Sequence, residues 1–368
     1  MHILHIDTEK TWRGGENQVR LLVEGLSALG IESSIAAPPG SELAKRMEPT
    51  CRVFETSLRG ELNIRAAYNI ANFCKENGVT IIDCHSSHAH SIGLLCKQFF
   101  LPNVKLVVHR RVDFPPKTGL ANRFKYLNKG VDCYIAISKA INEILVHYGV
   151  PEEKTVTVPS AVDKSVYAGF ERSQEKIKWC TKYGLDPQVP LIGQAAAMTS
   201  QKGYETLLES LAILKQEGRS FHCLVAGDGP LRASLEALRQ SLGLERCLSF
   251  IGWINEVPSF LSALDIFAMP SNFEGLGTAA LDAIYAGCPV AASSVGGLKE
   301  SIIHERTGLL AQKKNAKDFA CQLARLLDDG AFRTKLNSQA QLYCDRNFSL
   351  DAMVKGNLKA YQTLSKLG

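Results

Sequence analysis

Short apolar runs alternate with helical patterns along this chain of 368 residues, and no other feature constrains its fold as strongly. Runs this short have the length of buried strands, while the stretches between them, such as 16–29 and 139–148, have the period of amphipathic helices. The strands expected in the first half lie at 3–6, 34–37, 81–84, 105–109, 134–137 and 155–158. This alternation indicates βαβ units and a parallel sheet.

The same pattern begins again after the middle of the chain. A strand that ends at Val158 is followed by P-S-A-V-D and a polar helix, so we place a domain boundary near residue 165. Later strands are expected at 191–195, 222–226, 248–252, 266–269 and 289–292, with helices at 204–216, 231–242 and 278–286. The expected fold class is therefore α/β, with two doubly wound Rossmann-like domains, 1–165 and 166–349, that face a central cleft.

The composition is typical of a globular protein without membrane spans. Hydrophobic residues make up 45% of the chain and charged residues 21%, which are ordinary fractions. No apolar run reaches the roughly 18 residues that span a bilayer. The first residues, M-H-I-L-H-I-D, lack the positive start of a signal peptide. The 11 cysteines are scattered without a C-x-x-C pair, so we expect reduced, buried thiols in a cytoplasmic protein.

One segment, 105–129, is more basic than the mild net charge of +5 suggests. Its basic residues are Lys105, Arg110, Arg111, Lys117, Arg123, Lys125 and Lys129, and its one acid is Asp113. Such a segment is either an ordinary solvated face or a surface for anionic lipid head groups or a phosphorylated acceptor. No nucleic-acid-binding motif accompanies it, so nucleic acid is not an expected partner.

A motif in the second half combines glycines with two carboxylates. Residues 271–289 read S-N-F-E-G-L-G-T-A-A-L-D-A-I-Y-A-G-C-P. Gly275 and Gly277 precede a helical pattern, and the exposed backbone N–H groups at such a helix start bind phosphate. Asp282, in the second turn, is placed to accept hydrogen bonds from ribose hydroxyls, and Glu274 is placed to reach a second polyol. The motif therefore predicts a site for a sugar nucleotide.

This stretch resembles the E-x7-E motif of the retaining glycosyltransferases of family 4, which have the GT-B fold; the second acid is Asp282 where the family has Glu. The resemblance extends from Gly14-Gly15 to T-G-L-L at 307–310. It implies a C-terminal helix, about 350–368, that packs back on the first domain, and it gives Glu274 the transferred sugar. The donor-binding residues that it implies are Gly14, Gly15, Gly227, Gly275, Leu276, Gly277, Thr278 and Asp282.

Lys202, in M-T-S-Q-K-G, matches the lysine that pairs with the donor diphosphate in this family. The leaving nucleoside diphosphate gains charge as the glycosidic bond breaks, and a fixed cation stabilises that charge. The family places an arginine about five residues earlier, where this chain has Ala197. The candidates to replace that arginine from the facing domain are Arg110, Arg111 and Arg13.

His109 ends an expected strand, in V-V-H-R-R, and a histidine at a similar place in the family lies beside the reacting sugar. The alternative is a histidine whose ring is satisfied by the backbone. The acceptor side is expected at His88, Arg110 and Arg111. His85, His88 and His90 in C-H-S-S-H-A-H also suggest a metal, but no fourth ligand stands nearby and the chain has no D-x-D sequence. We therefore expect no metal and no other cofactor.

The resemblance predicts an enzyme that transfers a sugar from a UDP- or GDP-sugar to a glycan or lipid-linked acceptor, in bacterial lipopolysaccharide or surface polysaccharide synthesis. Its expected place is the cytoplasm, at the inner face of an anionic membrane. Because Ala197 and Asp282 depart from the family pattern, an inactive sugar-nucleotide-binding subunit is an alternative, as is an epimerase of the same fold. Two further alternatives for 275–282 are a dinucleotide fingerprint, G-L-G-T-A-A, and a merely structural helix capped by Thr278.

Overall fold

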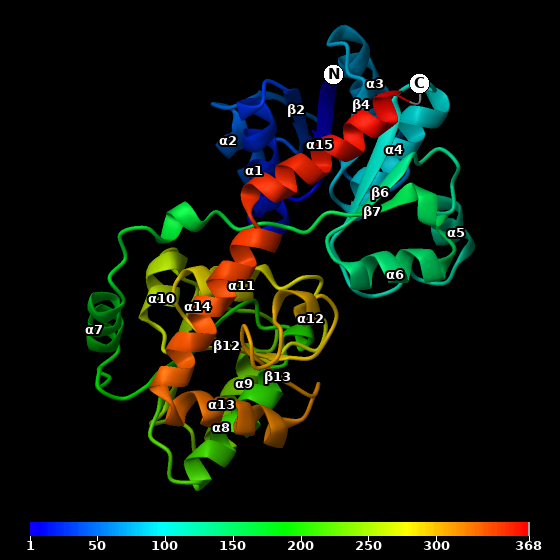
Figure 1. Ribbon diagram of the computed structural model, residues 1–368. Helices are drawn as coiled ribbons and strands as arrows, with labels where there is room; N and C mark the ends of the chain where they lie inside the picture. Colours follow the sequence, from blue (N-terminus) through cyan, green and yellow to red (C-terminus); the bar gives the residue numbers. More distant parts are fainter. Residues whose placement is uncertain (367–368) are drawn as a thin grey trace. The chain divides into compact units, whose positions relative to one another are not determined.

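A computed structural model describes residues 1–366, which form two compact units (Figure 1). Unit 1 comprises Met1–Ala161 together with the C-terminal segment that begins at Phe348, and unit 2 comprises Val162–Asn347. The boundaries expected from the sequence, at 165 and 349, lie a few residues after those of the structure. Residues 367 and 368 of the expected last helix lie outside the described part.

Unit 1 contains a parallel sheet of seven strands in the order β3-β2-β1-β4-β5-β6-β7. The direction of chain progression reverses between β1 and β4, as in doubly wound folds. Its elements are β1 (His2–Ile6), α1 (Gly14–Ala28), β2 (Glu32–Ala37), α2 (Glu42–Met47), β3 (Arg52–Glu55), α3 (Ile64–Glu76), β4 (Ile81–Cys84), α4 (Ser87–Phe99), β5 (Lys105–Arg110), α5 (Leu120–Tyr126), β6 (Cys133–Ala136), α6 (Lys139–Tyr148), η1 (Glu152–Lys154), β7 (Thr155–Thr157) and α15 (Leu350–Lys366).

Unit 2 contains a parallel sheet of six strands in the order β10-β9-β8-β11-β12-β13. The corresponding reversal lies between β8 and β11. Its elements are η2 (Lys164–Tyr167), α7 (Arg172–Lys182), β8 (Leu191–Ala195), η3 (Ser200–Lys202), α8 (Tyr204–Gln216), β9 (His222–Ala226), α9 (Arg232–Ser241), β10 (Leu248–Gly252), α10 (Val257–Ala263), β11 (Ile266–Met269), α11 (Thr278–Tyr285), β12 (Val290–Ser293), α12 (Leu298–Ser301), β13 (Leu309–Ala311), α13 (Ala316–Asp328) and α14 (Gly330–Asn347).

The predicted fold class is confirmed, because each unit is a parallel, doubly wound α/β sheet. Every expected strand occurs within two residues of its predicted bounds, but β3 and β13 were not predicted. Both lie at an edge of their sheet. An edge strand is covered less completely, so β3 carries Arg52 and Glu55 at its exposed ends and lacks a continuous apolar run.

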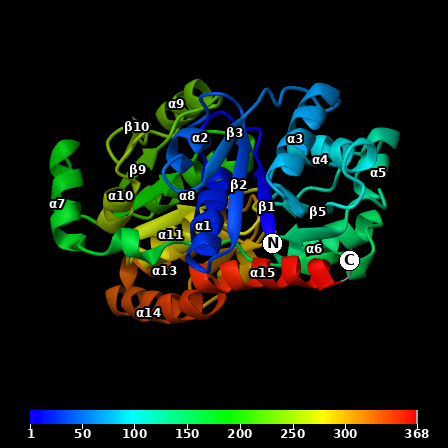
Figure 2. The same ribbon diagram turned by 90° about the horizontal axis from the view of Figure 1, so that it is seen from above.

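The last helix belongs to the core of unit 1. α15 packs against α1, and it lies beside α1 in both Figure 1 and Figure 2. Glycine at position 25 of α1 allows the close approach, since a Cβ there would lie 2.3 Å from Cγ2 of Val354. The side chains that α15 buries against unit 1 are Met353, Val354, Tyr361 and Leu364. Burial of this kind, about 1.5–3 kcal/mol for a large apolar side chain, stabilises unit 1 through a segment distant in sequence.

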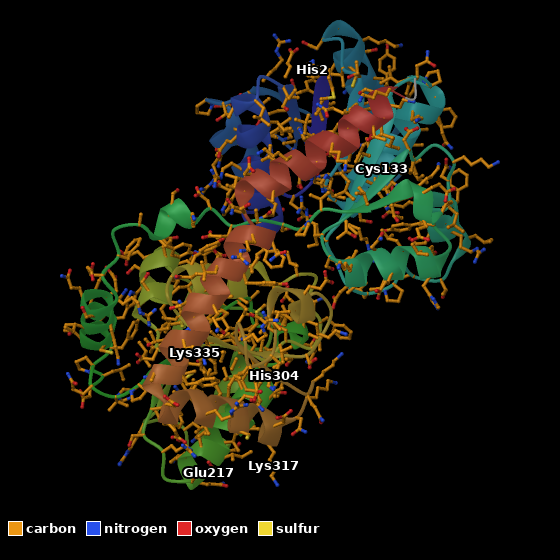
Figure 3. The ribbon with its side chains drawn as sticks, viewed as in Figure 1. His2, Cys133, Glu217, His304, Lys317 and Lys335 are labelled. Atoms are coloured by element: carbon orange, nitrogen blue, oxygen red, sulfur yellow. The ribbon has the colours of Figure 1, made fainter. Side chains whose placement is uncertain are left out.

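The cysteines are free thiols and most are buried, among them Cys133 in the core of unit 1 (Figure 3). Cys321 is exposed, and Cys51 and Cys247 are half-buried, so the expectation of buried thiols is correct for the others. Among residues 1–366, no helix combines the length and the apolar character that crossing a bilayer requires.

Candidate functional site

The loops that follow the strands of unit 2 are joined to one another at the carboxyl edge of its sheet. Ligands of doubly wound sheets bind at this edge, next to the strands where the order reverses. Three backbone hydrogen bonds connect the loops: Met198 N to Asp228 O (2.9 Å), Asn272 N to Gln201 O (2.7 Å) and Gly297 N to Glu274 O (3.1 Å). The loops after β8, β9, β11 and β12 therefore form one continuous surface.

Glycines make this close packing of loops possible. Gly203 and Gly227 have left-handed backbones, with φ of 64° and 123°. A Cβ on Gly227 would lie 2.0 Å from the carbonyl oxygen of Ala196, and one on Gly203 would lie 1.9 Å from that of Pro270. Gly227, which the sequence predicts as donor-binding, thus has a demonstrable role in shaping the loops.

The structure brings Lys202 and Glu274 together. Lys202 ends η3, Glu274 lies in the loop after β11, and the Lys202 Nζ donates to Glu274 Oε2 across 2.7 Å. The two side chains are 25% and 16% exposed, so solvent reaches both. Two residues predicted to act on one donor, 72 positions apart in sequence, therefore meet at the carboxyl edge of the second sheet.

The helix that follows Glu274 begins as the motif predicts. α11 starts at Thr278, and Gly277 is its N-cap with a left-handed φ of 86°. The alternative in which Thr278 is the N-cap is therefore wrong, because Thr278 is already helical. The Leu276 side chain is buried in the core, so only its backbone is available to a ligand. The start of α11 at Thr278 follows the ion-paired Glu274 by four residues.

Asp282 lies in the second turn of α11 and has a partner within unit 2. Its Oδ1 accepts a hydrogen bond of 2.6 Å from the hydroxyl of Tyr167 in η2. Burial raises the pKa of Asp282 to about 6, and the hydrogen bond from Tyr167 opposes this rise. Nothing in the sequence pointed to Tyr167, because its segment has no motif. Any ribose bound by Asp282 has to share or displace this hydroxyl.

Unit 1 has a second cluster of polar groups at and below the carboxyl edge of its sheet. His109 lies near the end of β5, and its Nε2 is 3.1 Å from Oδ2 of Asp83 in β4. The same oxygen accepts a hydrogen bond of 2.6 Å from the hydroxyl of Tyr361 on α15. His5 Nδ1 and His85 Nε2 each lie 3.2 Å from it. Of this cluster the sequence singled out His109 and, as a possible metal ligand, His85, although an acid within the apolar run I-I-D-C was a usable signal for Asp83.

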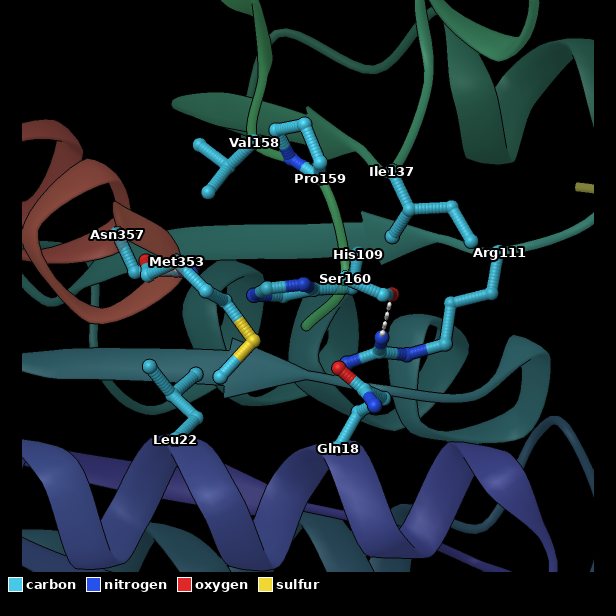
Figure 4. A pocket seen from close by; sticks show the side chains of 10 residues that line it. All are labelled: Gln18, Leu22, His109, Arg111, Ile137, Val158, Pro159, Ser160, Met353 and Asn357. Carbon is cyan, nitrogen blue, oxygen red and sulfur yellow. Dashed lines mark hydrogen bonds between the residues drawn. The ribbon is translucent and has the colours of Figure 1, made fainter. Parts of the chain in front are cut away.

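Arg111 and His109 line a small cavity of unit 1 (Figure 4). The Arg111 guanidinium donates to Ser160 Oγ (3.4 Å) and to His85 Nδ1 (3.2 Å). By contrast, His2, which is labelled in Figure 3, has only structural partners. Its ring contacts Asn77 O and Ser34 Oγ, both at 2.8 Å. The ring of His109 instead pairs with a side chain, that of Asp83. The alternative interpretation, in which the backbone accepts the hydrogen bond of this ring, is therefore wrong.

The histidines of C-H-S-S-H-A-H do not converge. His88 is exposed on α4, while His90 is buried and packs against Tyr126 and Tyr134. Among the residues that the structure describes, one group has the make-up of a metal site: His5, Asp83 and His85.

The contacts of His85 disfavour a metal at this group. An arginine can only donate, so Nδ1 of His85 accepts from Arg111 and the proton of the neutral ring is on Nε2. A metal at Nε2 would require a lone pair on this nitrogen, which here carries the proton. In a metal-bound histidine the other ring nitrogen normally donates its N–H to an acceptor, whereas Nδ1 of His85 accepts. The cluster is therefore better described as a hydrogen-bond network.

Two residues of the basic segment lie inside unit 1. The Arg110 guanidinium donates to the Tyr126 hydroxyl (2.5 Å) and to Phe114 O. Lys125 Nζ donates to Ser87 O (2.6 Å) and Ser87 Oγ (2.9 Å). The expectation that 105–129 forms one basic surface is therefore wrong for these two residues, because both are buried. Their hydrogen bonds within unit 1 offset the cost of burying a charge.

Gly14 and Gly15 form the first turn of α1 rather than a loop before it. The backbone N–H of Arg13, the N-cap, donates to Glu16 Oε2 at 2.6 Å. A Cβ on Gly15 would meet no atom within 4 Å, so the space beside this turn is open. Arg13 is exposed at the same helix start.

Two family models match the chain, one in each unit. The model of the glycosyl transferases group 1 matches residues 175–343, and that of glycosyltransferase family 4 matches residues 12–166. Together the two matches span most of the chain, and they include Lys202, Glu274 and Asp282 in the first and His109 in the second.

Individual relatives agree with these models. An uncharacterized glycosyltransferase of Methanocaldococcus jannaschii is 26% identical over 292 residues, which are 77% of this chain and 75% of the relative. The lipopolysaccharide core biosynthesis glycosyltransferase LpsE of Rhizobium meliloti is 22% identical over 350 residues, 94% of this chain and 95% of the relative. Among solved structures, Anabaena HepE in complex with UDP and glucose superposes with a TM-score of 0.84 at 20% identity over 100% of both chains.

Proposed function

The chain belongs to the family 4 glycosyltransferases with the GT-B fold, and from this premise we propose that it moves a sugar from a nucleotide-sugar donor to an acceptor with retention of the anomeric configuration. The observation that carries the proposal is the contact of 2.7 Å between Lys202 and Glu274 at the carboxyl edge of the second sheet. The complex of Anabaena HepE with UDP and glucose supports a nucleotide sugar, with UDP as the first base to test.

In this proposal each group takes one part of the donor. Lys202 and the backbone N–H groups at the start of α11 bind the diphosphate, since a helix start and a cation both favour an anion. Glu274 accepts hydrogen bonds from hydroxyls of the transferred sugar. Asp282, which already accepts from Tyr167, binds the ribose. When the diphosphate binds, it takes the place of the Glu274 carboxylate as the anion that pairs with Lys202.

The reaction breaks the bond between the anomeric carbon and the diphosphate oxygen, and the electron pair leaves with the diphosphate. The acceptor hydroxyl oxygen then bonds to the anomeric carbon on the same face, and its proton passes to the departing diphosphate. Lys202 stabilises the negative charge that develops. The proposal needs neither a protein nucleophile nor a metal, because the leaving group acts as the base and Lys202 supplies the positive charge.

We further propose a lipid-linked or glycan acceptor of a bacterial surface polysaccharide, as the name of the Rhizobium relative suggests. The segment after His109 supports contact with a lipid surface. In α5 and just before it, Leu120, Phe124 and Phe114 are 88%, 63% and 44% exposed. The basic residues Lys117, Arg123 and Lys129 of the same segment are also exposed. Apolar side chains surrounded by cations are suited to an anionic membrane surface.

The direct test is the turnover of two variants. A thermal-shift panel of UDP-, GDP-, ADP- and CMP-sugars first identifies the donor, because a ligand of the folded state raises its stability. Lys202→Ala and Glu274→Ala are then each expected to lower nucleotide release by a hundredfold or more, about 3 kcal/mol of transition-state stabilisation. Lys178→Ala is a matched control, since it removes an exposed ion pair of unit 2 with Glu256.

Other outcomes distinguish the alternatives. Wild-type rates in both variants would end the assignment of these two residues. Binding of a sugar nucleotide without release of the nucleotide would favour an inactive binding subunit. An isomerised donor without transfer to an acceptor would favour an epimerase.

A further inference from the structure

Asp83 is the centre of a buried network that reaches from the sheet of unit 1 to the last helix. The residue is fully buried in β4, and its Oδ2 is 2.6 Å from the Tyr361 hydroxyl and 3.1 Å from His109 Nε2. Burial alone would raise the pKa of Asp83, but its interactions with the neighbouring histidines outweigh burial and hold the pKa well below its usual range. Asp83 is therefore a carboxylate that can only accept hydrogen bonds.

This contact determines which nitrogen of His109 carries the proton. Burial lowers the pKa of His109, although Asp83 opposes the shift, so the ring is neutral at pH 7. A neutral ring has one N–H, and the carboxylate of Asp83 can pair only with a nitrogen that donates. The proton is therefore on Nε2, and Nδ1 has the lone pair. No hydrogen bond joins Nδ1 to another of the described residues, and the side chain, which is 3% exposed, lines the small cavity of Figure 4.

We propose that Asp83 and Tyr361 are positioning residues that hold His109 in its Nε2–H form, so that Nδ1 keeps its lone pair and can accept a hydrogen bond from a hydroxyl group. This inference rests on the proposed function and on the role in sugar binding that the family resemblance implies for His109. The Tyr361 hydroxyl orients the carboxylate, and it comes from α15, 278 positions away in sequence. The C-terminal helix thus contributes to the site through one hydrogen bond in addition to its apolar packing.

Histidine-selective ¹⁵N NMR of the ligand-free protein tests the network without any need for turnover. Comparison with His109→Gln assigns the His109 signals, and the wild type is expected to show a single Nε2–H tautomer. In Asp83→Asn the amide can donate as well as accept, so a mixture of tautomers is expected. The same single tautomer in the wild type and in Asp83→Asn would overturn the inference.

Kinetics give the second measurement. Tyr361→Phe is expected to lower kcat about tenfold, within the range typical of groups that orient a ligand or catalytic side chain, with the KM for the donor unchanged. Tyr134→Phe is the matched control, because Tyr134 is also a buried tyrosine of unit 1 but its hydroxyl donates to a backbone carbonyl, that of Tyr126, at 2.9 Å. Equal kcat in the two tyrosine variants would contradict the positioning role, even if Asp83→Asn fails to fold.

The two proposals fail in distinguishable ways. If His109→Gln turns over at the wild-type rate, the proposed role of His109 is wrong. The tautomer measurement still decides whether Asp83 fixes the ring in that case, because it uses the free protein.

Discussion

At the scale of single residues, Asp7 makes the stability of unit 1 depend on pH. It follows β1, is 2% exposed, and accepts a hydrogen bond of 2.8 Å from Glu9 N. Burial raises the pKa of Asp7 from 3.8 to about 7. Between these two values the folded state binds a proton that the unfolded state has lost, so stability falls as pH rises from about 4 to about 7. Asp7→Asn, which is neutral throughout, is expected to raise the melting temperature more at pH 8 than at pH 5.

Thermal unfolding of the wild type and Asp7→Asn across that pH range checks this prediction. If the difference in melting temperature between the two proteins is the same at every pH, Asp7 titrates at an ordinary pKa in the folded protein. Asp282, whose pKa burial raises to about 6, has the same sign, so Asp282→Asn is the positive control in unit 2. We expect Asp282→Asn to be more stable but to bind the donor less tightly, because residues at functional sites often reduce the stability of the fold.

At the scale of elements, α5 is the place where the proposed membrane contact is testable. This short helix exposes Leu120 and Phe124, 88% and 63%, while it buries Tyr126 and Lys125. Insertion of an apolar side chain contributes about 1.5–3 kcal/mol, so Leu120→Ser with Phe124→Ser is expected to weaken binding to anionic vesicles at least tenfold. Arg123→Gln is expected to weaken it less, by about 1 kcal/mol, and only at low salt.

Vesicle sedimentation with and without anionic lipid measures both effects. Leu342→Ser is the matched control, because Leu342 is 60% exposed on α14 of unit 2. If all of these variants sediment with vesicles as the wild type does, α5 is an ordinary solvated face. Lys125 is not substituted in this test, because its side chain donates internal hydrogen bonds to Ser87. A substitution there would change the stability of unit 1 instead of its contact with the vesicle.

The elements also show how far the sequence could predict the structure. Most strands were predictable because each has an apolar run. β3 has polar, exposed residues at both ends, and β13 has only three residues, so neither was recognised. The sequence assigned Lys202 and Glu274 to one donor, and they meet because they follow neighbouring strands of one sheet. The bonds of Asp83 to Tyr361 and of Asp282 to Tyr167 were not, because a tyrosine on a distant helix or in a linker has no local pattern.

At the scale of the whole molecule, the chain builds unit 1, then unit 2, and then returns to unit 1 with α15. The contact of α15 with α1 depends on Gly25, where a Cβ would lie 2.3 Å from Val354 Cγ2. Because valine is branched at Cβ and cannot rotate away freely, Gly25→Ala is expected to destabilise unit 1 by about 1–3 kcal/mol despite the better helix propensity of alanine. Gly15→Ala, on the same helix but with no atom within 4 Å, is expected to be neutral or slightly stabilising.

Hydrogen exchange locates the effect of Gly25→Ala. Each unit has its own hydrophobic core, so we expect faster exchange in β1 and β4 and unchanged exchange in β8 and β9, with binding of the nucleotide sugar largely retained. Equal acceleration in both sheets would mean that the units unfold together as one cooperative body. In that case the return of the chain through α15 stabilises the whole enzyme, and the loss of donor binding in the variant would parallel the loss of fold.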